Sequence, residues 1–149
     1  MRTQLLIGTT SGNTEYLAES LATLLNQAGI ETTLHDQPDL KTVPYRDASW
    51  LICIATHGAG EYAESIDEFM HDLAKEKPDL SNLRVAIVSV GDSSYDTFCQ
   101  AGIDAQQLVS DLGATFISER LDIDMMLDPD PEATASAWLQ NILDRDLLP

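Results

Sequence analysis

A short polar run follows the first apolar segment of the chain. It consists of four hydroxyl residues, a glycine and an asparagine: Thr9, Thr10, Ser11, Gly12, Asn13 and Thr14. Free N–H groups at the start of a helix bind anions, and hydroxyl and amide side chains add further donors. The run contains no lysine, unlike the loop of nucleotide triphosphatases, and it lacks the three-glycine dinucleotide fingerprint. We therefore expect it to bind a single terminal phosphate, with an ordinary Ser/Thr helix cap as the alternative.

Two further loops carry residues suited to a flat ligand. The first consists of Thr56, His57, Gly58, Ala59 and Gly60. The second contains Gly91, Asp92, Ser93, Ser94, Tyr95, Asp96, Thr97, Phe98 and Cys99. Glycines allow the backbone to approach a planar ligand closely, and the ring of Tyr95 could stack on it. The alternatives are that His57 is an ordinary loop residue and that Tyr95 fills the core.

A parallel sheet would bring these loops together. The continuous apolar runs at 5–7, 50–55 and 85–90 are typical of strands covered on both faces. Shorter strands are expected at 31–34 and within 115–123. Apolar residues at helical spacing predict helices over 17–28, 66–73, 98–112 and 135–142. This order predicts a doubly wound α/β sheet, in which ligands bind beyond the carboxyl ends of the strands.

Composition limits the class of protein. The length of 149 residues suits one domain, 1–149. The net charge of −17 disfavours nucleic acid and anionic membranes as partners and favours a basic protein, although charge can also serve solubility alone. No apolar run approaches the about 18 residues of a membrane span, so we expect a cytoplasmic protein. Cys53 and Cys99 lack metal-ligand spacing, and we expect reduced thiols and no metal site.

The three loops together resemble those of flavodoxins. Residues 9–14 are similar to the phosphate loop of that family, and residues 91–95 with Phe98 and Cys99 are similar to the loop that carries its stacking tyrosine. The resemblance extends over the whole chain and is strongest for the short-chain, MioC-type members. The FMN domains of diflavin reductases are similar more loosely. It implies a flavodoxin-like three-layer sandwich with a five-stranded parallel sheet of order 2-1-3-4-5.

The same resemblance implies noncovalent FMN. Its phosphate would lie on residues 9–14 and its ring system between residues 56–61 and 91–99, with Tyr95 on the outer face. His57 stands where many members carry an aromatic residue. The implied cofactor-binding set is Thr9, Thr10, Ser11, Gly12, Asn13, Thr14, Thr56, His57, Gly58, Ala59, Gly60, Gly91, Asp92, Ser93, Tyr95, Phe98 and Cys99.

Flavodoxins are electron carriers, so the resemblance implies a role without catalytic residues. The protein would be a monomer that carries one electron at a time, at low potential, from an NADPH-dependent flavodoxin or ferredoxin reductase to acceptors with basic faces. The alternative is an FMN-dependent NAD(P)H:quinone-type reductase, for which the sequence shows no nicotinamide site. A phospho-acceptor receiver domain is disfavoured, because residues 55–57 at the end of the third strand contain no aspartate.

Overall fold

The computed structural model describes residues 3–9, 13–57 and 60–145. The chain alternates strands and helices in the order that the apolar runs predict, with two short strands added. The elements are β1 (Thr3–Gly8), α1 (Asn13–Gln27), β2 (Thr32–His35), β3 (Ala48–His57), β4 (Glu61–Tyr62), α2 (Glu64–Glu76), β5 (Leu83–Gly91), α3 (Gln100–Asp111), β6 (Thr115–Phe116), β7 (Leu121–Asp124) and α4 (Pro131–Asp144).

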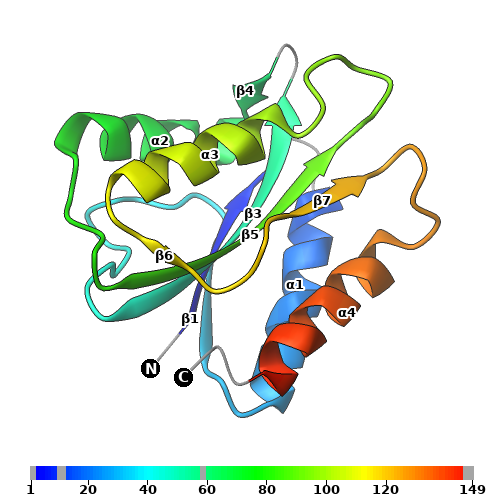
Figure 1. Ribbon diagram of the computed structural model, residues 1–149, viewed down its shortest axis with the longest axis horizontal. Helices are drawn as coiled ribbons and strands as arrows, with labels where there is room; N and C mark the ends of the chain where they lie inside the picture. The colour runs from blue at the N-terminus through cyan, green and yellow to red at the C-terminus, as the bar shows by residue number, and fades with distance from the viewer. Residues whose placement is uncertain (1–2, 10–12, 58–59, 146–149) are drawn as a thin grey trace.

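The strands β1, β3 and β5 form the centre of a parallel sheet (Figure 1). The order along the sheet is β2-β1-β3-β5-β6, which confirms the expected order 2-1-3-4-5. The expected fifth strand is divided into β6 and β7, which both pair with β5 and are separated by residues 117–120. The two-residue β4 is an unpredicted addition that pairs antiparallel with the end of β3.

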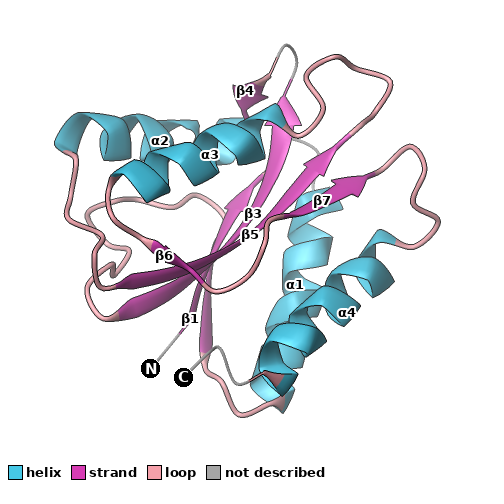
Figure 2. Cartoon of the chain, viewed as in Figure 1, coloured by secondary structure: helices cyan, strands magenta, loops and turns pink. Residues whose placement is uncertain are grey.

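Helices cover both faces of the sheet, so the fold is a three-layer sandwich (Figure 2). Alternate strand residues point to opposite faces. Leu5 and Ile7 pack on one side with buried residues of α1 and α4, whereas Leu6 packs on the other with α2 and α3. The central strands consist of continuous apolar runs because both of their faces are buried in apolar layers. These layers also hold the strand ends in place.

Two helix boundaries follow from the backbone. Asp130 caps α4 by accepting a hydrogen bond from the N–H of Ala133 at 3.1 Å, with Pro131 in the first turn. The prediction that the third helix starts at 98 was wrong by two residues. Cys99 has a φ of 55°, a left-handed conformation that a right-handed helix excludes, so α3 begins at Gln100.

Two features are absent from residues 3–9, 13–57 and 60–145. Within these ranges no helix combines the length and apolar character needed to cross a membrane. The same ranges contain no grouping of three His, Cys, Asp or Glu side chains that could hold a metal ion.

Candidate functional site

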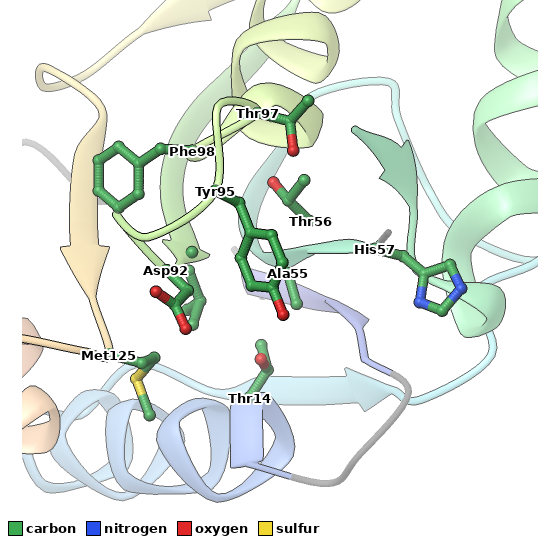
Figure 3. A pocket seen from close by; sticks show the side chains of 11 residues that line it. Thr14, Ala55, Thr56, His57, Asp92, Tyr95, Thr97, Phe98 and Met125 are labelled. Atoms are coloured by element: carbon green, nitrogen blue, oxygen red, sulfur yellow. The ribbon is translucent and has the colours of Figure 1, made fainter. Parts of the chain in front are cut away.

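A cavity of about 340 Å³ opens at the carboxyl ends of β3 and β5. Its walls come from these strand ends, the loop after β5, the first turn of α1 and the residue after β7 (Figure 3). The lining residues are Thr14, Ala55, Thr56, His57, Val90, Gly91, Asp92, Tyr95, Thr97, Phe98 and Met125. The position is the one expected for a ligand of a doubly wound sheet, and the volume is in the range of ligand pockets.

The end of β3 forms one wall. The Oγ1 of Thr56 accepts a hydrogen bond from the N–H of Ala101 at 3.1 Å, which ties this wall to the first turn of α3. The N–H of Gly60 donates to the carbonyl of His57 at 3.0 Å, and Gly60 has a φ of +109° that favours glycine. The imidazole of His57 points away from Tyr95 (Figure 3). His57 therefore lies at the rim of the cavity.

The second wall depends on close packing at the end of β5. A Cβ atom on Gly91 would lie 2.8 Å from the N of Cys99 and 3.1 Å from Cδ1 of Phe98, so only glycine allows the loop to approach this backbone. Cys99 is buried, and its thiol donates to the carbonyl of Ser89 at 3.7 Å. Burial raises the pKa of this thiol to about 11. Cys99 thus anchors the loop to β5.

A tight turn presents Tyr95. The Oδ1 of Asp92 accepts hydrogen bonds from the N–H and the Oγ of Ser94 at 2.9 and 2.6 Å, and the N–H of Tyr95 donates to the carbonyl of Asp92 at 3.1 Å. The side chain of Tyr95 is 64% exposed. Its ring crosses the cavity with the hydroxyl towards Thr14 (Figure 3). A ring held in this way can stack on a flat ligand.

Asp124, at the end of β7, joins two loops around the cavity. Its Oδ1 accepts hydrogen bonds from the N–H groups of Ser93 at 3.1 Å and Met126 at 3.0 Å. A hydrogen bond from the side chain of Ser93 is the main cause that holds the pKa of Asp124 below its usual value, and the backbone N–H groups of Ser93 and Met126 act in the same direction. The N–H of Met125 also donates to the carbonyl of Gly91 at 2.8 Å. The β5 loop and the segment after β7 therefore form one connected rim.

The chemistry of the lining is neutral or acidic. Among the described lining residues, Asp92 is the one carboxylate, and none is lysine or arginine. Hydroxyl groups come from three threonines and Tyr95. A phosphate bound nearby would depend on neutral donors and on the N-terminus of α1, as the sequence suggests.

The structure brings together many of the residues expected at the site. Those that line the cavity are Thr14, Thr56, His57, Gly91, Asp92, Tyr95 and Phe98. Gly60 lies in an adjoining cavity that shares His57, whereas Ser93 and Cys99 belong to the supporting loop. Thr9 lines a separate hollow with the start of α2. Thr10, Ser11, Gly12, Gly58 and Ala59 lie outside the described residues, as does the side chain of Asn13.

Four lining residues were not predicted: Ala55, Val90, Thr97 and Met125. Ala55 and Val90 are the last residues of predicted apolar runs, so their position at the ligand-binding edge was an available signal. Thr97 lies within the predicted ligand loop, residues 91–99. Met125 follows the fifth predicted strand, whose bounds the sequence does not define. No sequence feature indicates that Met125 lines a site.

Comparison with known proteins identifies the family. The family model described as Flavodoxin matches residues 5–138. Protein MioC of Escherichia coli strain K12 is 38% identical over 136 residues, which cover 91% of each chain. The sulfite reductase [NADPH] flavoprotein alpha-component of Bacillus subtilis is 36% identical over 93% of this chain and 22% of its own length.

A solved structure agrees with these relatives. The C101A mutant of flavodoxin from Pseudomonas aeruginosa superimposes with a TM-score of 0.88 at 26% identity, covering 97% of both chains. The family match spans most of the chain, and the fold and the place of the cavity are those that the loop motifs predict. The chain is a member of the flavodoxin family, whose cofactor is FMN.

Proposed function

We propose that the protein is an electron carrier that binds FMN in the cavity and passes one electron at a time between a reductase and acceptor proteins. When bound, FMN supplies the one-electron redox chemistry. The observation that carries this proposal is that the ends of β3 and β5 and the first turn of α1 line one cavity. All three are segments that sequence motifs assign to a flavin site.

The described residues fit FMN in shape and chemistry. Tyr95 offers an exposed ring for stacking, on a loop that packs against Gly91 so closely that a side chain there would collide with Cys99. The start of α1 offers N–H groups to a phosphate without a cation. In this proposal residues 9–14 bind the phosphate, and residues 56–61 and 91–99 hold the ring system. Cys99 acts by supporting the loop.

Carboxylates around the cavity support a low reduction potential. Asp92 lines the cavity, and Glu61 and Glu64 line the adjoining one that shares His57. A like charge about 10 Å away costs about 1.7 kcal/mol at an effective dielectric constant of about 20. That energy corresponds to some tens of millivolts per charge, with about 59 mV for each tenfold change in a one-electron equilibrium. Several carboxylates together would therefore oppose the addition of negative charge.

The charge of the chain also supports a basic partner. A net charge of −17 steers a basic reductase or acceptor towards the protein and raises the rate of association at low salt. The same charge opposes self-association, which favours a monomer. Cys53 and Cys99 are buried free thiols, typical of a reducing compartment such as the cytoplasm.

A reconstituted electron-transfer assay tests the proposal. FMN-loaded protein is mixed with NADPH alone, or with NADPH, an NADPH-dependent flavodoxin reductase and oxidised cytochrome c. We expect cytochrome c reduction only in the complete mixture, at a rate that falls as ionic strength rises. Steady NADPH oxidation by the protein alone would instead assign it to the reductases.

A further inference from the structure

We propose that a cavity at the divided edge of the sheet, here called the edge cavity, is a second ligand site that binds a small aromatic carboxylate. Its volume of about 730 Å³ is in the range of ligand pockets. Its walls come from Gln106 of α3, from residues 116–121, and from Trp138, Asn141 and Arg145 at the end of α4. None of these described residues also lines the candidate FMN cavity, so the inference goes beyond the proposed carrier function.

The edge cavity lies beside the point at which the fifth strand is divided. Strands β6 and β7 pair with β5, and residues 117–120 connect them between α3 and α4 (Figure 1). Phe116 packs against the apolar layer under α2 and α3, whereas Ile117 and Leu121 pack against the layer under α1 and α4. All three side chains remain partly exposed. Both apolar layers therefore reach the surface at this cavity.

One part of the lining suits a flat apolar group. Phe116 and Trp138 both line the edge cavity, and both are only partly buried. The indole N–H of Trp138 donates to the carbonyl of Glu119 at 3.2 Å, which holds the ring against the connecting segment. An aromatic ring that is already held in place stacks on a flat ligand at a low cost in entropy.

The edge cavity is also unusually rich in positive charge for this chain. Its lining contains Arg120 and Arg145, two of the eight basic residues, but one carboxylate, that of Glu119. The whole chain has 25 acidic residues, so the ratio of charges is reversed here. The described lining of the candidate FMN cavity, by contrast, contains no lysine or arginine. A local excess of positive charge on an acidic protein favours an anionic group at this place.

Arg120 is held in one orientation by its neighbours. Its Nε and Nη2 donate to Oδ1 and Oδ2 of Asp122 at 2.7 and 3.1 Å, and its Nη1 donates to Oε1 of Gln106. These bonds within the described part of the chain leave two of the five N–H donors of the guanidinium for a ligand. Asp122 offsets the charge of Arg120, so the net positive charge comes from Arg145, the residue that caps the C-terminus of α4.

The two kinds of lining together define the class of ligand. A carboxylate accepts paired hydrogen bonds from a guanidinium, and the aromatic and aliphatic side chains cover a flat apolar body. Inorganic phosphate would leave the apolar lining uncovered, whereas a neutral aromatic molecule would not use the arginines. The net charge of −17 disfavours nucleic acid. A small aromatic molecule with one carboxylate satisfies both parts of the lining.

An NMR titration of the FMN-loaded protein with 1-naphthoate tests the site. The chain has two tryptophans, so the ¹H–¹⁵N spectrum contains two indole signals, and Trp138→Phe identifies them by removing one. Trp138 lines the edge cavity, whereas Trp50 is 1% exposed in the core and serves as the internal control. We expect a saturable shift of the Trp138 signal and no shift of the Trp50 signal.

Paired variants test the charge. Arg145→Gln should raise the dissociation constant of 1-naphthoate about fivefold, because it removes the charged donor. Arg46→Gln is the matched control, since Arg46 is an exposed arginine that lies over the ring of Tyr45, outside the edge cavity. It should bind the probe like the wild type, and both variants should keep the wild-type dissociation constant for FMN. The neutral analogue 1-naphthalenemethanol should bind about fivefold more weakly than 1-naphthoate.

Three results would overturn the proposal. The first is a Trp138 signal that shows no saturable shift. The second is equal binding of 1-naphthoate and its neutral analogue, or of the probe to Arg145→Gln and Arg46→Gln, because the arginines would then recognise no carboxylate. The third is a shift that occurs only in flavin-free protein, which would place the probe in the FMN cavity.

Discussion

The hydroxyl of Ser65 joins the first turn of α2 to the end of β1 by two hydrogen bonds. Its Oγ accepts from the N–H of Thr9 at 2.9 Å and donates to the carbonyl of Ile7 at 2.9 Å. Thr9 is the first residue of the expected phosphate motif. One side chain from α2 therefore fixes the point at which β1 enters that motif.

Replacing Ser65 should affect both folding and phosphate binding. Ser65→Ala removes both hydrogen bonds and should lower the free energy of unfolding by about 1–2 kcal/mol, measured by urea denaturation. It should also raise the dissociation constant of FMN more than that of riboflavin, which lacks the phosphate. Ser65→Thr keeps the hydroxyl and is the control. Equal weakening of both ligands would show that Ser65 does not act through the phosphate motif.

The contact between α3 and β5 leaves no room for a methyl group. A Cβ atom on Gly102 would lie 2.2 Å from Oγ and 2.4 Å from Cβ of Ser89. Gly102→Ala should therefore lower the free energy of unfolding by about 1–3 kcal/mol, despite the higher helix propensity of alanine. Ser110→Ala, at an exposed position of α3, is the matched control. A Gly102→Ala protein as stable as wild type would contradict this packing.

Ser89 itself carries a buried hydroxyl without a partner. In the described part of the chain its Oγ makes no hydrogen bond, and the residue is 0% exposed. Because a buried unpaired hydroxyl is unfavourable, Ser89→Ala should leave the free energy of unfolding unchanged or raise it by up to about 1 kcal/mol. A clear loss of stability in thermal or urea denaturation would show that the hydroxyl has a partner.

The two thiols should be inert in the folded protein. Burial raises the pKa of Cys53 to about 12 and that of Cys99 to about 11. Both thiols stay protonated at pH 8, and labelling with a thiol reagent should require unfolding. The raised pKa values also predict a loss of stability as the pH rises from about 9 towards these values, because the unfolded chain ionises first. Rapid labelling of the native protein would contradict the burial of the thiols.

His35 should make the fold sensitive to acid. Its Nε2 lies 2.7 Å from Oε1 of Gln4, and burial lowers its pKa while the charge of Asp36 opposes this shift. The folded state binds the proton less well than the unfolded state. Stability is therefore full above the ordinary pKa of about 6.5 and falls as the pH decreases through the lower folded value. His35→Gln should reduce the difference between urea midpoints at pH 7.5 and 5.5, and an unchanged difference would exclude His35 as its source.

Sequence patterns predict the central elements well and the edges poorly. The strands β1, β3 and β5 are covered on both faces, and this burial requires the continuous apolar runs from which they were predicted. The division of the fifth strand depends on which residues of 115–124 reach the neighbouring strand, a tertiary property without a local signal. The start of α3 depends on the left-handed backbone of Cys99. Cysteine is not a residue type that predicts a left-handed conformation.

The sequence likewise predicts some residues of the site and misses others. Gly91 and Tyr95 were predicted as site residues because their types suit a close backbone approach and a stacking ring, and the group that approaches Gly91 in the structure is the loop at Phe98 and Cys99. Met125 was not, because a methionine after an uncertain strand is indistinguishable from a core residue. The role of Asp124, which joins two loops by accepting hydrogen bonds from Ser93 and Met126, is visible only once the fold brings residues 93 and 124 together.

If the cavity at the ends of β3 and β5 holds FMN, a fluorescence titration should detect the binding. Protein freed of flavin is added to a fixed concentration of FMN, in parallel with Tyr95→Ala and with Tyr45→Ala, which alters a tyrosine outside the cavity. We expect saturable quenching at one FMN per chain, weakened about tenfold by Tyr95→Ala, or about 1.4 kcal/mol, and unaffected by Tyr45→Ala. FMN fluorescence that persists in excess wild-type protein would contradict this expectation.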